Sequence, residues 1–366
     1  MKRVQLILVG GFLGAGKTTL LTRAAQRLAA DGWRVALLAN DQADELVDSA
    51  VLGESGAAVD EVTGGCFCCR FTDMTAALDR LVCESAADVI LCEPVGSCTD
   101  LSATVLQPLK QAHADRFQLA PFAVLVDTRQ VQVLDRLRQG ADRDDAVMYL
   151  YRTQLEEADL IVLNKTDLVT PEELAAIEAQ VREQFPDRPV VRMAAAEGEG
   201  VAEWLELLER LPAGGRLADV DYETYAAGEA ALGWMNASGT LSAQTPVDWR
   251  ALAAALLTAI RERLATDGAQ IAHVKLFFKS PAGHVAANLA GNDAPITLRP
   301  SPNPDTDAVT LLINARVRTA PAHLRAAVEA ALDEVAGEGI TAAITKVRSF
   351  SPARPEPTHR MGSVLP

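Results

Sequence analysis

The sequence lacks the features of several large classes of protein. No apolar run approaches the ~20 residues that a membrane-spanning helix requires, and Lys and Arg are fewer than Asp and Glu, 34 against 49. The formal net charge is therefore −15, which disfavours binding to nucleic acid or to an anionic membrane surface. We expect no membrane-spanning segment, no nucleic-acid partner and no membrane partner.

The cysteines do not follow the pattern of a disulfide framework. There are only six in 366 residues, and three of them lie within four positions, in the stretch GGCFCC. Adjacent cysteines make poor disulfides because their Cα atoms lie about 3.8 Å apart, below the usual ~4.4 Å minimum of a bridge. Clustered thiols in a long chain favour metal binding or redox chemistry, and we expect a cytoplasmic protein.

The length predicts two domains, and the charge is spread unevenly along the chain. A chain of 366 residues with 49% hydrophobic residues can bury a large core and exceeds the length of most single domains. Residues 213–366 contain 15 acidic and 14 basic residues, whereas residues 1–212 contain 34 acidic and 20 basic residues. The acidic excess therefore belongs to the first part of the chain, where it indicates a solvated surface, with a field that attracts metal ions as the alternative.

The stretch GFLGAGKTT, residues 11–19, fits the phosphate-loop pattern G-x-x-x-x-G-K-[ST] between a predicted strand and a predicted helix. Glycines let backbone N–H groups close around phosphate oxygens, Lys17 supplies positive charge to the β and γ oxygens, and the Thr18 hydroxyl can ligate Mg²⁺. The nucleotide-binding residues expected from this loop are Gly11, Gly14, Ala15, Gly16, Lys17, Thr18 and Thr19.

The stretch NKTD, residues 164–167, follows an apolar strand and predicts selection of guanine. The Asp167 carboxylate can accept from both N1–H and the N2 amino group of guanine, and Asn164 can serve the N7/O6 edge, whereas adenine offers no matching pair of donors. Lys165 lies between them and joins the expected GTP site. Residues 193–200, MAAAEGEG, offer a backbone N–H for the guanine O6. A helix-capping loop is the alternative interpretation of NKTD.

Two acidic residues end predicted strands. Glu93 ends the strand DVILCE, the place where an acid holds the water shell of Mg²⁺ or positions an attacking water. We therefore expect Lys17, Thr18 and Glu93 to carry the hydrolysis of GTP. Asp127 ends FAVLVD in a similar way and is equally well explained as the cap of a turn.

The three clustered cysteines predict a metal site. Cys66 and Cys68 are separated by one residue and can point the same way in an extended segment, and Cys69 adds a third thiolate where the chain turns. Three thiolates suit Zn²⁺, and also Cu(I) or Co²⁺. A permanent structural zinc site would draw ligands from a second pair of closely spaced cysteines, and the sequence has none. Buried packing or a redox thiol is the alternative.

The remaining thiols and histidines carry weaker predictions. Cys92 lies within an apolar strand, where packing explains it, and neither Cys83 nor Cys98 has an expected partner. The five histidines are scattered, and His113 is interpreted as a solvated side chain rather than as a metal ligand.

Strand-like and helix-length segments alternate through residues 1–211, which predicts an α/β P-loop GTPase domain with a mostly parallel sheet. Residues 212–247 predict a linker or a loosely packed crossing. Residues 248–350 predict a smaller α+β domain with helices at Asp248–Thr266 and Pro321–Ala336. Residues 351–366 form a proline-rich tail, expected to be disordered or draped over the surface.

The motifs GFLGAGKTTLL, GGCFCC, CEPVG and NKTDL, in this order, resemble those of the CobW-type metallochaperone GTPases, a group that includes nitrile hydratase activators and zinc-transfer GTPases. The resemblance covers about residues 4–210 and is specific, because this family couples a phosphate loop to a C-x-C-C motif. It implies that the nucleotide state changes the metal site and releases the ion to a client protein. It also implies that NDQAD is the acidic switch loop, with Asp41 and Asp44 as metal-site carboxylates.

The sequence departs from this family in three respects. Relatives often have Asn-Glu-Phe-Gly where this chain has Asn40, Asp41, Gln42 and Ala43, so the oxygen ligand sits on a shorter side chain. Many relatives carry a His-rich loop, which is absent, and the second domain does not obviously match the usual C-terminal domain.

We predict a GTP-hydrolysing metallochaperone that uses Mg²⁺, carries Zn²⁺ or Co²⁺ at its C-x-C-C motif and delivers the ion to a client metalloprotein or metalloenzyme. One alternative is a metal-responsive GTPase switch without transfer. A second alternative is a GTP-dependent activator of a corrinoid or cobalt enzyme. The oligomeric state is left open, with a homodimer as one expectation.

Overall fold

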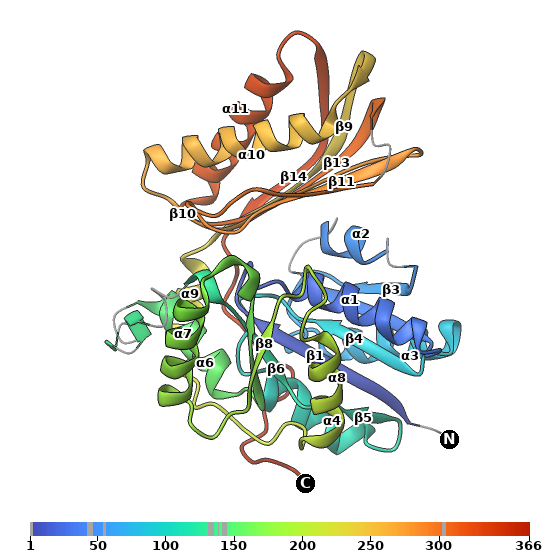
Figure 1. Cartoon of the computed structure of the whole chain (residues 1–366), viewed down its shortest axis with the longest axis vertical. Coiled ribbons are helices and arrows are strands. Elements are labelled where there is room, and N and C mark those ends of the chain that lie inside the picture. Colours follow the sequence, from blue (N-terminus) through green and yellow to red (C-terminus); the bar gives the residue numbers. More distant parts are fainter. Residues whose placement is uncertain are drawn as a thin grey trace. The chain divides into compact units, whose positions relative to one another are not determined.

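The computed structural model describes residues 3–41, 47–53, 56–130, 135–137, 139–140, 145–301 and 305–366. The chain divides into two compact units, each built around its own sheet (Figure 1). Unit 1 comprises residues 1–42, 52–228 and 354–366, and unit 2 comprises residues 43–51 and 229–353.

Unit 1 contains a parallel sheet with the strand order β3-β2-β4-β1-β6-β7-β8, and β5 pairs beside β1. Most of these strands are buried along nearly their whole length, which explains why they appear in the sequence as continuous apolar runs. The strands are β1 (Val4–Gly11), β2 (Val35–Asn40), β3 (Ala58–Val62), β4 (Val89–Glu93), β5 (Phe117–Leu119), β6 (Ala123–Asp127), β7 (Leu160–Asn164) and β8 (Val190–Met193).

Helices alternate with these strands along the chain. Local sequence sets some of their ends: Thr170 and Glu173 form a reciprocal capping box at the start of α7, where Pro171 takes the first helical position. Among the helices that the structure describes, none combines the length and apolar character needed to cross a membrane. The helices are α1 (Lys17–Ala30), α3 (Phe71–Ser85), α4 (Gln107–His113), α6 (Ala146–Glu156), α7 (Pro171–Gln184), α8 (Val201–Arg210) and α9 (Tyr222–Ala230).

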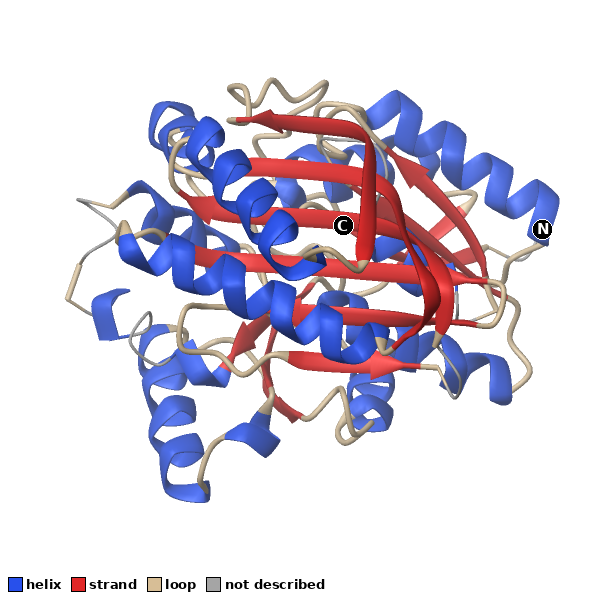
Figure 2. Cartoon of the chain, turned by 90° about the horizontal axis from the view of Figure 1, so that it is seen from above, coloured by secondary structure: helices blue, strands red, loops and turns tan. Residues whose placement is uncertain are grey.

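Unit 2 contains an antiparallel sheet with the strand order β12-β11-β10-β13-β9-β14. Its two long helices lie across one face of the strands (Figure 2). Residues 47–51 of a short helix, α2 (Val47–Gly53), also belong to this unit. The other elements are β9 (Gly233–Val247), α10 (Trp249–Thr266), β10 (Gln270–Ser280), β11 (Gly283–Leu289), β12 (Thr297–Pro300), β13 (Thr306–Arg318), α11 (Pro321–Ala336) and β14 (Ile340–Phe350).

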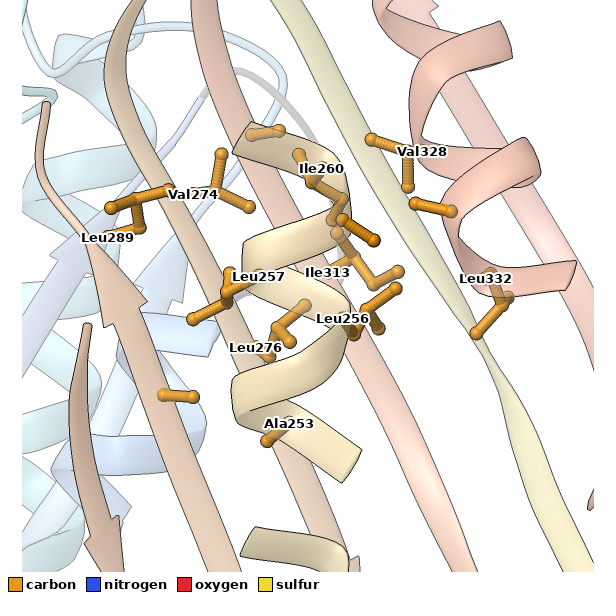
Figure 3. Close-up of a cluster of buried hydrophobic side chains, with 14 of the residues drawn as sticks. Ala253, Leu256, Leu257, Ile260, Val274, Leu276, Leu289, Ile313, Val328 and Leu332 are labelled. Atoms are coloured by element: carbon orange, nitrogen blue, oxygen red, sulfur yellow. The ribbon is translucent and has the colours of Figure 1, made fainter. Parts of the chain in front are cut away.

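The core of unit 2 lies between its helices and its sheet (Figure 3). Leu256, Leu257 and Ile260 recur at helical spacing on α10, so they point to one side of the helix. There they meet alternate residues of the strands, including Leu276 and Ile313, all of them fully or almost fully buried. The apolar residues that repeat about every 3.6 positions on the helix therefore pack against those that repeat every two positions on the strands, and together they form one apolar layer.

The predicted fold class, a parallel α/β domain followed by a smaller α+β domain, is confirmed. The structure differs from the expected linker over residues 212–247, because α9 and the long strand β9 lie in this range. The first part of β9 holds Gly233, Asn236, Ser238 and Gly239, which interrupt the apolar alternation that marks a strand. Residues 351–366 form no helix or strand.

Candidate functional site

The predicted site residues meet at one edge of the parallel sheet, where the carboxyl ends of its strands lie. Register pairs Glu93 with Ala39, the residue before the end of β2, and Asn164 with Asp127, so the carboxyl ends of neighbouring strands lie side by side. In sheet order, the cysteine loop follows β3, Glu93 ends β4, the phosphate loop follows β1, and Asn164 ends β7. Parallel α/β sheets present their ligand sites at this edge.

The loop between β1 and α1 needs glycine for conformation and for space. Gly11, Gly14 and Gly16 have φ values of 130°, 82° and 100°, in the left-handed region that other residues avoid. A Cβ on Gly11 would lie 2.6 Å from the carbonyl oxygen of Leu125, and a Cβ on Gly16 would lie 2.4 Å from Nδ2 of Asn164. The loop is therefore held closely against β6 and the end of β7.

The first residues of α1 face the acidic end of β4. Lys17 is buried, and its Nζ donates to the carbonyl oxygen of Gly11 at 2.8 Å, so its charge lies within the loop. The Thr18 hydroxyl donates to Oε1 of Glu93 at 2.9 Å. Thr19 is half-buried in the same helical turn. The three residues expected to carry hydrolysis are thus brought together.

Of the residues expected to select guanine, Asn164 is buried and hydrogen-bonded within the protein, whereas Asp167 is exposed. The Asn164 amide donates to the carbonyl oxygen of Ala15 at 2.8 Å, and its Oδ1 accepts from the N–H of Ala195 at 3.1 Å. It therefore joins the phosphate loop to the segment after β8. Lys165 has a left-handed φ of 67°, and Asp167 is exposed in the following short 3₁₀ helix, Thr166–Leu168.

Asp127 is the centre of a charged network that sequence analysis did not identify. Its buried carboxylate accepts from Lys165 at 2.5 Å and from Arg129 at 2.8 Å. Burial by itself would raise the pKa of Asp127, but the Arg129 hydrogen bond and the Lys165 charge outweigh it and leave the pKa below its ordinary value. Lys165 also donates to the carbonyl oxygen of Gly14 at 2.6 Å, so Asp127 positions a lysine against the phosphate loop.

The cysteine loop brings its three sulfurs together. The N–H groups of Cys69 and Arg70 both donate to the carbonyl oxygen of Cys66, which closes a tight turn before α3. The sulfur of Cys66 lies 2.8 Å from that of Cys68 and 3.2 Å from that of Cys69, and the last two are 3.8 Å apart. Among the described residues, this is the group of potential metal ligands whose donor atoms all lie within 4.8 Å of one another.

The three thiols do not share one protonation behaviour. Hydrogen bonds from Cys68, Cys69 and Cys98 favour the Cys66 thiolate and lower its pKa. The hydrogen bond to Cys66, together with burial, raises the pKa of Cys69 to about 12. Cys66 is therefore the favoured thiolate of the cluster, and its neighbours are thiols that must lose protons when they bind a metal ion.

Asn40 ties the end of β2 to the cysteine loop. Its amide nitrogen donates to the carbonyl oxygens of Val62 at 2.9 Å and Gly65 at 2.8 Å, and its Oδ1 accepts from the N–H of Phe67 at 2.8 Å. Asp41 is half-buried next to it and is not part of the cysteine group. Asp44 lies outside the described residues.

The other cysteines and His113 occupy separate environments. Cys83 is exposed, and Cys92 is buried in β4, where burial raises its pKa far above the ordinary value. Cys98 was left without a partner by sequence analysis, but its thiol hydrogen-bonds to Cys66. His113 is half-buried at the end of α4, with its ring 6.5 Å from that of Phe71, and it does not join the cysteine group.

Comparison with known proteins identifies the family. A model described as CobW/HypB/UreG, nucleotide-binding domain, matches residues 5–192. The chain belongs to the CobW/HypB/UreG family. The match confirms the resemblance that the motifs indicated, and it assigns a CobW/HypB/UreG nucleotide-binding domain to this part of the chain.

Individual relatives match the chain over part of their length. A zinc chaperone CobW from Sinorhizobium sp is 31% identical over 222 residues, 55% of this chain and 61% of that protein. The zinc chaperone YeiR from Escherichia coli (strain K12) is 31% identical over 53% of this chain and 56% of that protein. The chain thus spans less than two thirds of either relative. A solved structure, the Zn(II)-bound YjiA GTPase from E. coli, covers 90% of this chain at 15% identity with a TM-score of 0.36, and the match takes in 99% of that protein.

Proposed function

We propose that this protein hydrolyses GTP and carries a zinc ion at Cys66, Cys68 and Cys69 for delivery to a client metalloprotein. The observation that carries the proposal is the position of the cysteine loop on the same sheet edge as the phosphate loop, with Glu93 between them. The nucleotide-binding family supports the first part, and relatives named zinc chaperones support the second.

The phosphate loop fits a nucleotide. Positive φ values disfavour side chains at Gly11, Gly14 and Gly16, and Gly16 also lies close to Asn164, so the loop presents backbone N–H groups and the Lys17 ammonium. A Cβ on Gly96, which lies outside the loop, would be 3.0 Å from Nζ of Lys17. The absence of a side chain at Gly96 therefore keeps the space around the Lys17 charge open. We infer that Gly11, Gly14, Ala15, Gly16 and Thr19 line the phosphate site.

Hydrolysis rests on positioning and charge rather than on a covalent intermediate. Lys17 would stabilise negative charge on the phosphates. Thr18 and Glu93 would hold Mg²⁺, directly or through water, and the ion when bound supplies charge neutralisation. Their 2.9 Å hydrogen bond keeps both oxygens in one place without the ion. Glu93 ends β4, which lies between β1 and β2 in the sheet. Its carboxylate can therefore respond both to phosphate in the loop after β1 and to the segment that follows β2.

Guanine selection is assigned to the exposed carboxylate of Asp167. Asn164 and Lys165 hold the turn in place through bonds to Ala15 and Gly14, so the adjoining Asp167 is presented on a fixed backbone. Asn164 keeps its proposed role at the N7/O6 edge of guanine. The segment that contains Ala195, proposed to offer an N–H to the guanine O6, is hydrogen-bonded to Asn164.

The cysteine cluster fits zinc. Two thiolates on a tetrahedral Zn²⁺ with ~2.3 Å bonds lie about 3.8 Å apart. The Cys68–Cys69 separation already has this value, at 3.8 Å. The Cys66 sulfur lies closer to each of the others and would move outward by about 1 Å or less to accept the ion. Three thiolates leave one coordination position open, which suits an ion that must be passed on.

Coupling between the two sites is assigned to Asn40. It ends β2, precedes the acidic segment that family resemblance makes a switch, and holds the cysteine loop by three hydrogen bonds. A rearrangement at the end of β2 would therefore alter the cysteine loop. Asp41, the next residue, is kept as a proposed oxygen ligand that such a rearrangement would bring closer.

The test is a titration of buffered Zn²⁺ and Co²⁺ with GDP and with a non-hydrolysable GTP analogue. Replacing Cys66, Cys68 or Cys69 by Ser should weaken metal binding far more than the matched changes Cys83→Ser and Cys92→Ser. Any factor by which GTP changes metal affinity must equal the factor by which metal changes GTP affinity. Lys17→Ala should abolish hydrolysis while metal binding in GDP persists.

Transfer is tested with an apo metalloprotein as acceptor. Stoichiometric movement of zinc on GTP hydrolysis supports delivery. Retention of zinc through many turnovers would instead favour a metal-responsive switch, and binding of cobalamin rather than bare ions would favour activation of a corrinoid enzyme. Equal metal affinity in both nucleotide states would remove the GTP-controlled carrier.

A further inference from the structure

The C-terminal tail, residues 354–366, follows unit 2 in the chain but belongs to unit 1. Residues 354–366 contain no helix or strand, yet they count with unit 1 and end beside α4 (Figure 1). The Leu365 N–H donates to Oε1 of the buried Gln107 at 2.7 Å, and Lys110 donates to the Leu365 carbonyl oxygen at 2.8 Å. The tail is therefore anchored at its far end.

The middle of the tail contacts the cysteine loop. The N–H of Glu356 donates to Sγ of Cys69 at 3.3 Å. The Thr358 N–H donates to the carbonyl oxygen of Cys68 at 2.9 Å, and its hydroxyl donates to the carbonyl oxygen of Cys69 at 3.1 Å. One bond therefore reaches a sulfur of the cluster, and two more fix the backbone that carries the sulfurs.

Two side chains hold this middle part in place. The His359 ring meets the Phe71 ring edge-on, with centroids 5.1 Å apart, at the start of the helix that follows the cysteines. Arg360 donates to Oδ2 of Asp100 at 2.7 Å, and the Asp100 side chain is only 1% exposed. Tyr222 donates to the same oxygen at 2.6 Å. A buried carboxylate that loses its cation is costly, so Arg360 is the strongest anchor of the segment.

We propose that Glu356–Arg360 form a closing strap over the cysteine cluster that sets how fast a metal ion enters and leaves it. The proposal rests on the proposed function, because it takes the cluster as the cargo site. The residues of the strap are positioning residues, since they act through the cysteines. Arg360 is the latch, and Asp100 with Tyr222 forms its socket.

The strap acts in two ways. An N–H donor to a ligating sulfur stabilises the thiolate and orients it, as outer hydrogen bonds do at other metal sites. The same segment occupies the space next to Cys69 that an incoming chelator or acceptor thiol must reach. Opening the latch therefore accelerates both uptake and release, whereas loss of a true ligand would accelerate release and weaken affinity.

The first experiment uses metal-free protein with Cys83→Ser, which removes the exposed thiol. The reaction of Cys69 with a thiol reagent is followed by peptide mapping, and the buried Cys92 reports global unfolding. Arg360→Ala should speed Cys69 modification about 10-fold or more, the scale of a lost charged hydrogen bond, without changing Cys92. Arg360→Lys should recover part of the protection.

The matched control is Arg354→Ala, in the same tail. Arg354 pairs with Glu223, and both side chains are more than half exposed, so its loss should change the Cys69 rate by less than about 2-fold. Thr358→Pro provides a second variant that leaves the Asp100 socket intact and removes both hydrogen bonds from Thr358 to the cysteine loop, one from its N–H and one from its hydroxyl. Rates of Cys69 modification that match wild type in both Arg360→Ala and Thr358→Pro overturn the strap.

The second experiment measures transfer of Zn²⁺ to and from a chromogenic chelator. Arg360→Ala should raise the uptake and release rates together, by about 10-fold, with a much smaller change in affinity. Release that accelerates alone would show a ligand defect and contradict the strap. If wild type binds no zinc, the proposed function fails, yet the Cys69 reaction still decides whether the strap covers the cluster.

Discussion

The side-chain oxygen of Asn40 accepts a 2.8 Å hydrogen bond from the backbone N–H of Phe67, the residue between the first two cysteines of the C-x-C-C motif. Asn40 also donates to carbonyl oxygens on β3 and in the glycine turn before the cysteines. A single buried side chain thus connects the end of β2 to the shape of the thiol cluster. Coupling of about 1–3 kcal/mol between such sites is typical.

Asn40→Ala tests this connection. It removes three hydrogen bonds from a buried place, and each unsatisfied partner costs about 1–3 kcal/mol. We expect zinc affinity to fall about 10-fold and its dependence on GTP against GDP to disappear, measured by competition with a chelator. Asn292→Ala is the control, because Asn292 bridges Ala269 and Ile271 in unit 2 in the same way. A loss of metal affinity of the same size in the control would contradict a specific role for Asn40.

Gly16→Ala should block nucleotide binding. The new Cβ would need a left-handed φ of 100° and would lie 2.4 Å from the Asn164 amide, so the link between the phosphate loop and β7 must break. Gly32→Ala provides the comparison, since Gly32 has a φ of 88° and nothing within 4 Å of the added atom. The control should lose about 1 kcal/mol of folding free energy and keep its GTP affinity. Equal GTP affinities of Gly16→Ala and Gly32→Ala, measured by calorimetry, would show that the phosphate loop can accommodate a Cβ at position 16.

Asp127→Asn should destabilise the protein in a pH-dependent way. The pKa of Asp127 in the folded state lies below the ordinary value of 3.8, so its contribution is fully present above pH 3.8 and is lost as the pH falls through the lower, folded-state pKa. We expect a loss of about 3 kcal/mol at pH 7, shrinking below pH 4, in urea unfolding followed by circular dichroism. Asp31→Asn, which breaks an exposed pair with Arg27, should cost less than about 1 kcal/mol. A difference that stays constant down to pH 3 would exclude the ionised pair as its origin.

Asp167→Asn should change the base that is bound. The carboxylate has partners on guanine that an amide cannot match, so GTP binding should weaken at least about 10-fold. The affinity for xanthine nucleotide should rise, because its ring offers a carbonyl where guanine has its amino group. Glu172→Gln, an exposed carboxylate at the start of α7, is the matched change and should leave both affinities unaltered. Retained preference for GTP in Asp167→Asn would remove the guanine assignment.

The sheet of unit 1 was predictable because its strands are buried on both faces and appear as apolar runs, such as the segment ending at Glu93. The phosphate loop and the cysteine cluster were predictable for another reason: their residues are neighbours in the chain, so spacing alone restricts where they can point. The polar β9 was missed because Asn236 and Ser238 are buried by pairing in the sheet and not by apolar character.

Contacts between distant residues depended on the tertiary structure. Asn40 reaches Phe67 because β2 and β3 pair in parallel, and Asp127 reaches Lys165 because β6 and β7 do. Glu356 reaches Cys69 across 287 positions of sequence, and Arg360 reaches Asp100 across 260. A period or a motif describes residues that share one element, whereas the partner of a buried charge or of a sulfur is set by which elements pack together. The sequence therefore identified the phosphate loop and the thiols, and folding decided which residues hold them in place.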